Sequence, residues 1–198
     1  MQGDSLPNWD VAGLVSRLYV YPVKSCAGVA LTEAILSPTG LAIDRRWMLV
    51  DGQGQFVTQR EQPRMALVTP EVTGQHVTLR APGMPPLPLG GDATDQPIAV
   101  RIWGETVLAM DAGEPAAQWF TRYLVPGAAP QPQNGFAGFQ LVRFDPACRR
   151  LSNLRWTGGR QALNQFSDGY PVLVLGEASL AALNQRLHDA GHDSVGID

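Results

Sequence analysis

The side chains best suited to chemistry lie in one short segment, Tyr21–Gly28, with the sequence Tyr-Pro-Val-Lys-Ser-Cys-Ala-Gly. It contains Lys24, the single lysine among 15 lysine and arginine residues. Lysine offers a compact charge with three rotatable donors and a pKa that shifts readily on burial, which arginine does not. Ser25 adds a hydroxyl, and Gly28 lets the backbone turn sharply or approach a ligand. The segment predicts an anion-binding loop; the alternative is an exposed, solvated lysine.

A second candidate is the pair Arg45 and Arg46, within the strand-like run Leu41–Val50. Alternation along a strand sends neighbouring side chains to opposite faces of a sheet. One guanidinium is then placed to join Lys24 and Ser25 on an anion, with each charge-assisted hydrogen bond contributing about 1.5–3 kcal/mol. Two solvated arginines are the alternative, and the pattern alone does not choose between them.

The remaining polar residues predict no catalytic set and no metal ligands. The histidines are dispersed, and Cys26 and Cys148 are too far apart in sequence for a metal-binding Cys-x-x-Cys pair, so both are expected to be reduced thiols. The arginines Arg149, Arg150 and Arg155 are expected to be solvated in a loop, and a second anion-binding patch is the less favoured alternative. No glycine-rich phosphate loop, dinucleotide-binding fingerprint or Gly-x-Ser-x-Gly motif occurs.

The elements that must position these residues are mostly short strands separated by Pro/Gly turns. Such spacing is typical of a β-barrel or sandwich. Asp51-Gly52 between two apolar runs predicts a hairpin. The predicted strands are Val11–Tyr21, Val29–Leu36, Leu41–Val50, Gln55–Arg60, Met65–Val68, Val77–Arg80, Ile98–Ile102, Val107–Met110, Phe139–Phe144 and the buried run Pro171–Leu175.

Two helices are predicted. The first is capped by Asp111 and ends before Pro126, and the second runs from Glu177 to Ala190 with Gly191 as its stop. The Pro126–Gly138 segment, rich in Pro, Gly, Ala and Gln, predicts a long loop.

The length, net charge and hydrophobic content of the chain limit the classes of function that are expected. The 198 residues, 44% of them hydrophobic, suffice for one large or two small globular domains. The net charge of -3 argues against a general nucleic-acid or anionic-membrane binder, so any anion site must be local. No segment approaches the ~20 apolar residues of a membrane span, and a cytoplasmic protein is expected.

Six ordered motifs resemble MOSC proteins with a MOSC N-terminal β-barrel domain, a family that includes amidoxime-reducing components, bacterial oxidoreductases and the C-terminal region of molybdenum cofactor sulfurase. The resemblance begins near Gly13 and covers nearly the whole chain. The motifs are the 21–28 segment, Asp-Arg-Arg-Trp-Met-Leu-Val at 44–50, Phe-Val-Thr-Gln-Arg at 56–60, Trp-Gly at 103–104 with Ala-Ala-Gln-Trp at 116–119, Ser-Asp-Gly-Tyr-Pro at 167–171 and Gly-Glu-Ala-Ser-Leu at 176–180.

This resemblance implies a mainly β protein with a few helices. A MOSC N-terminal β-barrel domain is expected over residues 13–135, and the incomplete start of a MOSC β-barrel over residues 136–198. MOSC domains continue with an Arg-Pro-Asn strand and, later, a cysteine that ligates molybdenum, whereas this sequence stops at Asp198. The chain is therefore expected to be truncated and, alone, inactive.

The resemblance also implies a cofactor and its contacts. MOSC proteins bind the molybdenum cofactor, a phosphate-bearing pterin dithiolene (molybdopterin), and their enzymes reduce N-hydroxylated compounds. Lys24, Ser25 and Arg45 match cofactor-contacting positions, so the resemblance selects Arg45 over Arg46. Gly169 and Tyr170 stand where the amidoxime-reducing enzymes carry hydroxylated residues that touch the cofactor.

The expected function is thus the cofactor-binding portion of a molybdenum-dependent oxidoreductase, supplied with electrons by an iron–sulfur, flavin or haem protein. A molybdenum-cofactor- or sulfur-carrying module without redox chemistry is the alternative. Pyridoxal phosphate held by Lys24 as a Schiff base is a third reading. It is disfavoured because no partner for the pyridine nitrogen and no phosphate-binding helix can be named.

Overall fold

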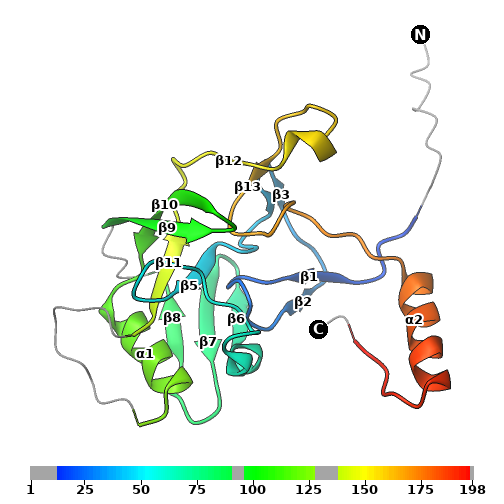
Figure 1. The fold of residues 1–198 in the computed structure, drawn as a ribbon, viewed down its shortest axis with the longest axis horizontal. Helices are drawn as coiled ribbons and strands as arrows, with labels where there is room; N and C mark the ends of the chain where they lie inside the picture. The colour runs from blue at the N-terminus through cyan, green and yellow to red at the C-terminus, as the bar shows by residue number, and fades with distance from the viewer. Residues whose placement is uncertain (1–12, 91–95, 128–137, 197–198) are drawn as a thin grey trace.

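A computed structural model of the chain describes residues 13–90, 96–127 and 138–196 (Figure 1). These residues are mainly β, which confirms the expected fold class. The strands are β1 (Leu18–Val20), β2 (Val29–Leu31), β3 (Leu36–Ser37), β4 (Gly40–Leu41), β5 (Trp47–Val50), β6 (Thr69–Thr73), β7 (His76–Arg80), β8 (Leu87–Leu89), β9 (Pro97–Ile102), β10 (Glu105–Asp111), β11 (Gln140–Phe144), β12 (Arg150–Leu151) and β13 (Leu163–Asn164). The α-helices are α1 (Glu114–Leu124) and α2 (Glu177–Asp189).

The largest sheet has the order β5-β11-β10-β9, with all neighbours antiparallel. A three-stranded sheet, β6-β7-β8, and the pairs β1-β2, β3-β4 and β12-β13 complete the strands of the described ranges. These described strands do not close into one barrel. Because β11 lies between β5 and β10, residues beyond 135 share a sheet with the preceding part, and the domain boundary expected there stays a prediction.

Strand β5, at one side of the four-stranded sheet, is buried on both of its faces. All four of its residues are buried, with Trp47 and Leu49 in one hydrophobic cluster and Met48 and Val50 in another. Successive side chains of a strand point to opposite faces, so a strand covered on both sides needs an unbroken apolar run. The run at 47–50 meets that need.

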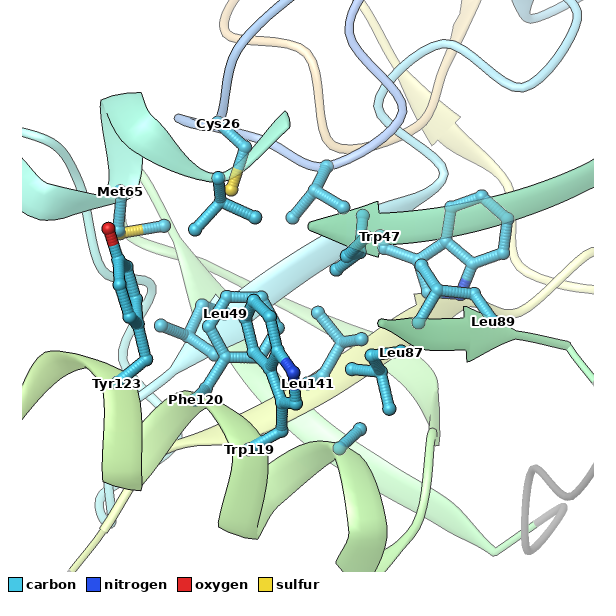
Figure 2. Packing of buried hydrophobic residues seen from close by; sticks show 14 of the residues in the cluster. Cys26, Trp47, Leu49, Met65, Leu87, Leu89, Trp119, Phe120, Tyr123 and Leu141 are labelled. Carbon is cyan, nitrogen blue, oxygen red and sulfur yellow. The ribbon is translucent and has the colours of Figure 1, made fainter. Parts of the chain in front are cut away.

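Helix α1 covers one face of this sheet, together with the three-stranded sheet (Figure 2). Its apolar side contributes Trp119, Phe120 and Tyr123, and Phe120 is completely buried. The helix begins with Gly113 as N-cap rather than with Asp111, whose Oδ1 accepts a hydrogen bond from the Gly113 N–H at 2.9 Å. The first helix was therefore predicted correctly, apart from its cap.

Two of the strands predicted before α1 are absent from the described residues. Met65–Val68 falls largely in a 3-10 helix, Pro63–Leu67, which begins at a proline suited to the first turn of a helix. Gln55–Arg60 forms no strand, although Phe56 makes an isolated bridge with Val50. The predicted turn at Asp51 is present, since its N–H donates to the carbonyl of Gln55 at 2.9 Å.

The C-terminal part is packed differently. The predicted buried strand Pro171–Leu175 is wrong, because no described strand pairs with it and Leu173 and Val174 are 84% and 87% exposed. Helix α2 follows at 177–189, close to the predicted bounds, but has no buried residue and stands apart from the sheets in Figure 1. The predicted Pro126–Gly138 loop lies mostly at 128–137, outside the described residues.

Across residues 13–90, 96–127 and 138–196, neither helix is both long and apolar enough to cross a membrane.

Candidate anion-binding site

A cavity of about 570 Å³ opens where five segments meet. All five residues predicted to hold a cofactor, Lys24, Ser25, Arg45, Gly169 and Tyr170, line it. These residues are far apart in the sequence, so the sequence alone does not show that they meet in one cavity. Their role as cofactor ligands stays a prediction. The other lining residues are Tyr21, Cys26, Thr58, Gln59, Arg60, Trp103, Ser167, Asp168, Val172 and Leu173.

The loop that carries Lys24 is fixed to the start of β5 by backbone hydrogen bonds. The Lys24 N–H donates to the carbonyl of Trp47 at 2.8 Å, and the Trp47 N–H donates to that of Pro22 at 3.0 Å. The Arg45 N–H donates to the Tyr21 carbonyl at 2.8 Å. This short parallel contact brings the loop and the turn before β5 to the same side of the cavity.

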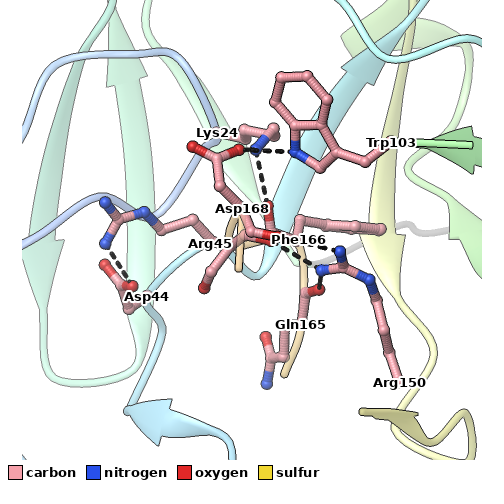
Figure 3. Close-up of polar contacts among 9 residues, drawn as sticks. Lys24, Asp44, Arg45, Trp103, Arg150, Gln165, Phe166 and Asp168 are labelled. Carbon is pink, nitrogen blue, oxygen red and sulfur yellow. Dashed lines mark hydrogen bonds and ion pairs between the residues drawn. The ribbon is translucent and has the colours of Figure 1, made fainter. Parts of the chain in front are cut away.

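Lys24 is buried rather than solvated, so the exposed-lysine alternative is wrong. Its side chain is only 7% exposed, and Nζ donates to the carbonyl of Phe166 at 3.0 Å and to the carboxylate of Asp168 (Figure 3). The rings of Phe56 and Trp103 lie 5.6 and 5.8 Å from Nζ. Burial lowers the pKa of Lys24, and the Asp168 carboxylate offsets only part of that effect.

Arg45 lies in the turn before β5 rather than on a strand, with a positive φ of 45°. Its Nη1 donates to Oδ2 of the buried Asp44 at 2.6 Å, and its guanidinium lies 4.5 Å from the ring centroid of Tyr21. Burial raises the pKa of Asp44, against the opposing charge and hydrogen bond of Arg45. Arg46 does not line the cavity and lies 5.2 Å from the Trp47 ring.

Arg150 is the main organising residue that the sequence reasoning missed. It was expected in a solvated loop, but it is buried and its guanidinium donates to the carbonyls of Gln165 and Ser167 at 2.7 Å and of Asp168 at 3.2 Å. Its Nε also donates to Glu105 at 2.9 Å. These bonds hold the 165–168 segment against the cavity. The neighbouring Arg149 is exposed, and nothing in the sequence distinguishes the two.

Trp103 and Asp168 were also missed as site residues. The Trp103 indole N–H donates to Oδ1 of Asp168 at 2.9 Å, and its ring lies 4.8 Å from that of Phe56. Burial alone would raise the pKa of Asp168, but the hydrogen bond and charge of Lys24, with the Trp103 hydrogen bond, hold it below its usual range. The signal for Asp168 was its position directly before Gly169.

Backbone strain gathers at this cavity. In the described ranges the non-glycine residues with positive φ are Ser25, Ile43, Arg45 and Trp103, and all but Ile43 line the cavity. Such conformations are uncommon outside glycine and cluster at functional sites. The cavity thus combines strained backbone with the exposed Arg60 and with two ion pairs, each of which has one buried partner.

Comparison with known proteins agrees with the resemblance seen in the sequence. The profile of the MOSC N-terminal beta barrel domain matches residues 12–126. Mitochondrial amidoxime reducing component 2 of Rattus norvegicus is 32% identical over 185 residues, covering 88% of this chain and 52% of the relative. Mitochondrial amidoxime-reducing component 1 of Homo sapiens is 35% identical over 186 residues, covering 88% and 51%.

The chain spans about half the length of the curated relatives it matches. A solution structure of a protein from Bordetella bronchiseptica is similar over 59% of this chain and 91% of that protein's chain. The sequence identity is 23% and the TM-score is 0.40, so the structural similarity is weak. The domain profile matches more than half of the chain, including the loop of Lys24, the turn of Arg45 and Trp103. The chain therefore belongs to the family of MOSC proteins with an N-terminal beta barrel domain.

Proposed function

We propose that this chain is the cofactor-binding part of a molybdenum-dependent oxidoreductase, and that its cavity holds the phosphate-bearing end of the pterin cofactor. The observation that carries the proposal is the convergence of Lys24, Ser25 and Arg45 on one cavity of about 570 Å³. That volume lies within the usual range of small-molecule sites, roughly 300–1,000 Å³. The names of the relatives extend the proposal to reduction of N-hydroxylated compounds by the whole protein.

The charges around the cavity suit a phosphate. Lys24, Arg45 and Arg60 contribute cationic groups to its lining, against the single carboxylate of Asp168. Arg45 can bind an anion while it keeps its bond to Asp44, because a guanidinium offers five N–H donors. The Ser25 hydroxyl adds a neutral donor. The role of these residues is to bind and orient the anionic end of the cofactor by charge-assisted hydrogen bonds.

The described residues suit the pterin phosphate better than the metal. Among them no group of three His, Cys, Asp or Glu side chains could hold a metal ion. Cys26 is buried, and burial raises the pKa of its thiol, so the reactive thiolate is suppressed. The chemistry that the bound cofactor would supply is electron transfer to the substrate, for which an iron–sulfur, flavin or haem protein is the proposed electron donor.

The test is cofactor retention by the chain expressed in a host that makes the molybdenum cofactor. Pterin released from the denatured protein is oxidised and quantified by its fluorescence. Lys24→Ala or Arg45→Ala removes a charge-assisted contact of about 1.5–3 kcal/mol, roughly ten- to a hundredfold in affinity. We therefore expect much less pterin in both variants than in the wild type.

Arg46→Ala is the matched control, since it removes the same side chain one residue away from the cavity. It should retain the wild-type amount of pterin. Equal loss in Arg45→Ala and Arg46→Ala, full retention in Lys24→Ala, or a wild-type chain that carries no pterin would contradict the proposal.

A further inference from the structure

The charge of Lys24, the most deeply buried cation of the cavity lining, already has a partner within the protein. Nζ of Lys24 pairs with the Asp168 carboxylate, and Oδ1 of that carboxylate also accepts the indole N–H of Trp103 at 2.9 Å. Asp168 and the carbonyl of Phe166 take two of the three Nζ donors, so an anionic ligand on Lys24 must either share its charge with Asp168 or displace that carboxylate. The carboxylate acts as an internal anion at the place where a ligand oxygen would bind.

The two members of this ion pair differ sharply in exposure. The Lys24 side chain is 7% exposed and that of Asp168 is 72% exposed. Lys24 is thus built into the wall, while Asp168 approaches it from the open side of the cavity. A ligand entering from solvent therefore meets the exposed carboxylate before the buried ammonium group.

The Asp168 side chain can leave without dismantling the wall behind it. Its backbone is held through carbonyls, since Arg150 donates to those of Ser167 and Asp168, and Phe166 is fully buried in the second hydrophobic cluster. The hydrogen bonds of Asp168 with Lys24 and Trp103 are made by its side chain. Rotation of an exposed side chain takes picoseconds to nanoseconds and needs no backbone change.

We propose that Asp168 is a displaceable counter-ion that sets the affinity and charge selectivity of the cavity: it neutralises Lys24 in the empty site and is expelled when a phosphate-bearing ligand binds. This rests on the proposed anion-binding function. Without Asp168, a buried ammonium group would stand unpaired, which is costly in the empty protein. With it, the site rejects neutral and weakly charged ligands that cannot replace a carboxylate.

The test is the affinity for inorganic phosphate, measured by titration calorimetry at low ionic strength. Asp168→Asn keeps the shape of the side chain but removes the competing charge, so we expect phosphate to bind roughly tenfold more tightly, the effect of one charge-assisted hydrogen bond. Glu71→Gln makes the same change of net charge at an exposed ion pair with Arg80 on β6 and β7, and should leave affinity unchanged.

Tryptophan fluorescence provides a second readout. Phosphate should alter the emission of the wild type, because the Trp103 N–H loses its carboxylate partner when Asp168 is displaced. Trp103→Phe, which keeps both Lys24 and Asp168, should abolish that change. A wild type that binds phosphate while Asp168→Asn binds it equally or more weakly would overturn the counter-ion role alone. No phosphate binding in either protein would overturn the anion site as well.

Discussion

Two short apolar runs of this chain lie in opposite environments, one buried and one exposed to solvent. Trp47–Val50 is β5, buried on both faces of the four-stranded sheet and paired along β11. Val172–Leu175 has a similar composition, yet all four residues are exposed and none lies in a strand. An apolar composition indicates that burial of a segment against other parts of the protein is favourable. Whether it becomes a strand depends on neighbours that offer backbone partners and apolar faces.

The cavity lies at the junction of these two regions. Lys24 and Arg45 are fixed beside β5, whereas Val172 and Leu173 line the cavity from the exposed run. One wall is therefore held by the hydrophobic core and the other by a segment with little packing of its own. Binding residues on the first wall are preorganised, and the second wall is free to adapt to what the cavity holds.

Hydrogen exchange should separate the two regions most strongly. Amides of β10, an interior strand between β9 and β11, should open only with global unfolding, at about 5–15 kcal/mol. Amides of Val172–Leu175 have no strand partner and should exchange with an opening free energy near zero. Mass spectrometry of peptides from the two segments measures this difference directly. Strong protection at 172–175 would mean that this run has partners in solution.

Replacing one large side chain on each helix by alanine should give the next largest contrast, in the free energy of unfolding. Phe120 of α1 is fully buried, so Phe120→Ala should lower the free energy of unfolding by about 3–5 kcal/mol. Leu183 of α2 is 45% exposed, so Leu183→Ala should change it by less than about 0.5 kcal/mol. Urea denaturation of both variants gives the values. Comparable losses would show that α2 is packed as tightly as α1.

The adjacent arginines Arg149 and Arg150 provide the smallest contrast. Arg150→Met removes a buried donor to three carbonyls and should cost about 2–3 kcal/mol in the free energy of unfolding. Arg149→Met removes an exposed side chain and should have no measurable effect. Thermal unfolding followed by circular dichroism compares them. Equal stability of the two variants would remove Arg150 from its proposed role in holding the 165–168 segment.

Much of the fold was predictable because it depends on local signals. The run at 47–50, the Asp51 turn and the apolar side of α1 all follow from periodicity or turn chemistry within a few residues. The failures have two different causes. Pro63 begins a 3-10 helix where a strand was predicted, which is a local effect. The run at 171–175 was predicted to be buried, but it is exposed, because burial depends on distant segments.

The candidate site was predictable only in part. Lys24 stood out as the single lysine, with the Ser25 hydroxyl beside it. The resemblance selected Arg45 over Arg46 and added Gly169 and Tyr170, and all five residues line the cavity. Arg150 gave no comparable signal, and Trp103 stood out only as part of a family motif. A buried arginine and an exposed one look alike in sequence, and a tryptophan that closes an ion pair looks like any other aromatic residue.

The order of residues specifies which chemical groups are present and which short segments carry them: a lone lysine, a hydroxyl and an arginine before a buried strand. How these groups are used depends on the folded structure. The Lys24 ammonium became buried because its loop docks on β5, and its charge is met by Asp168, 144 residues away along the chain. The strength of an interaction between two charges depends on their distance and burial rather than on their order in the chain. A local sequence pattern therefore cannot predict it.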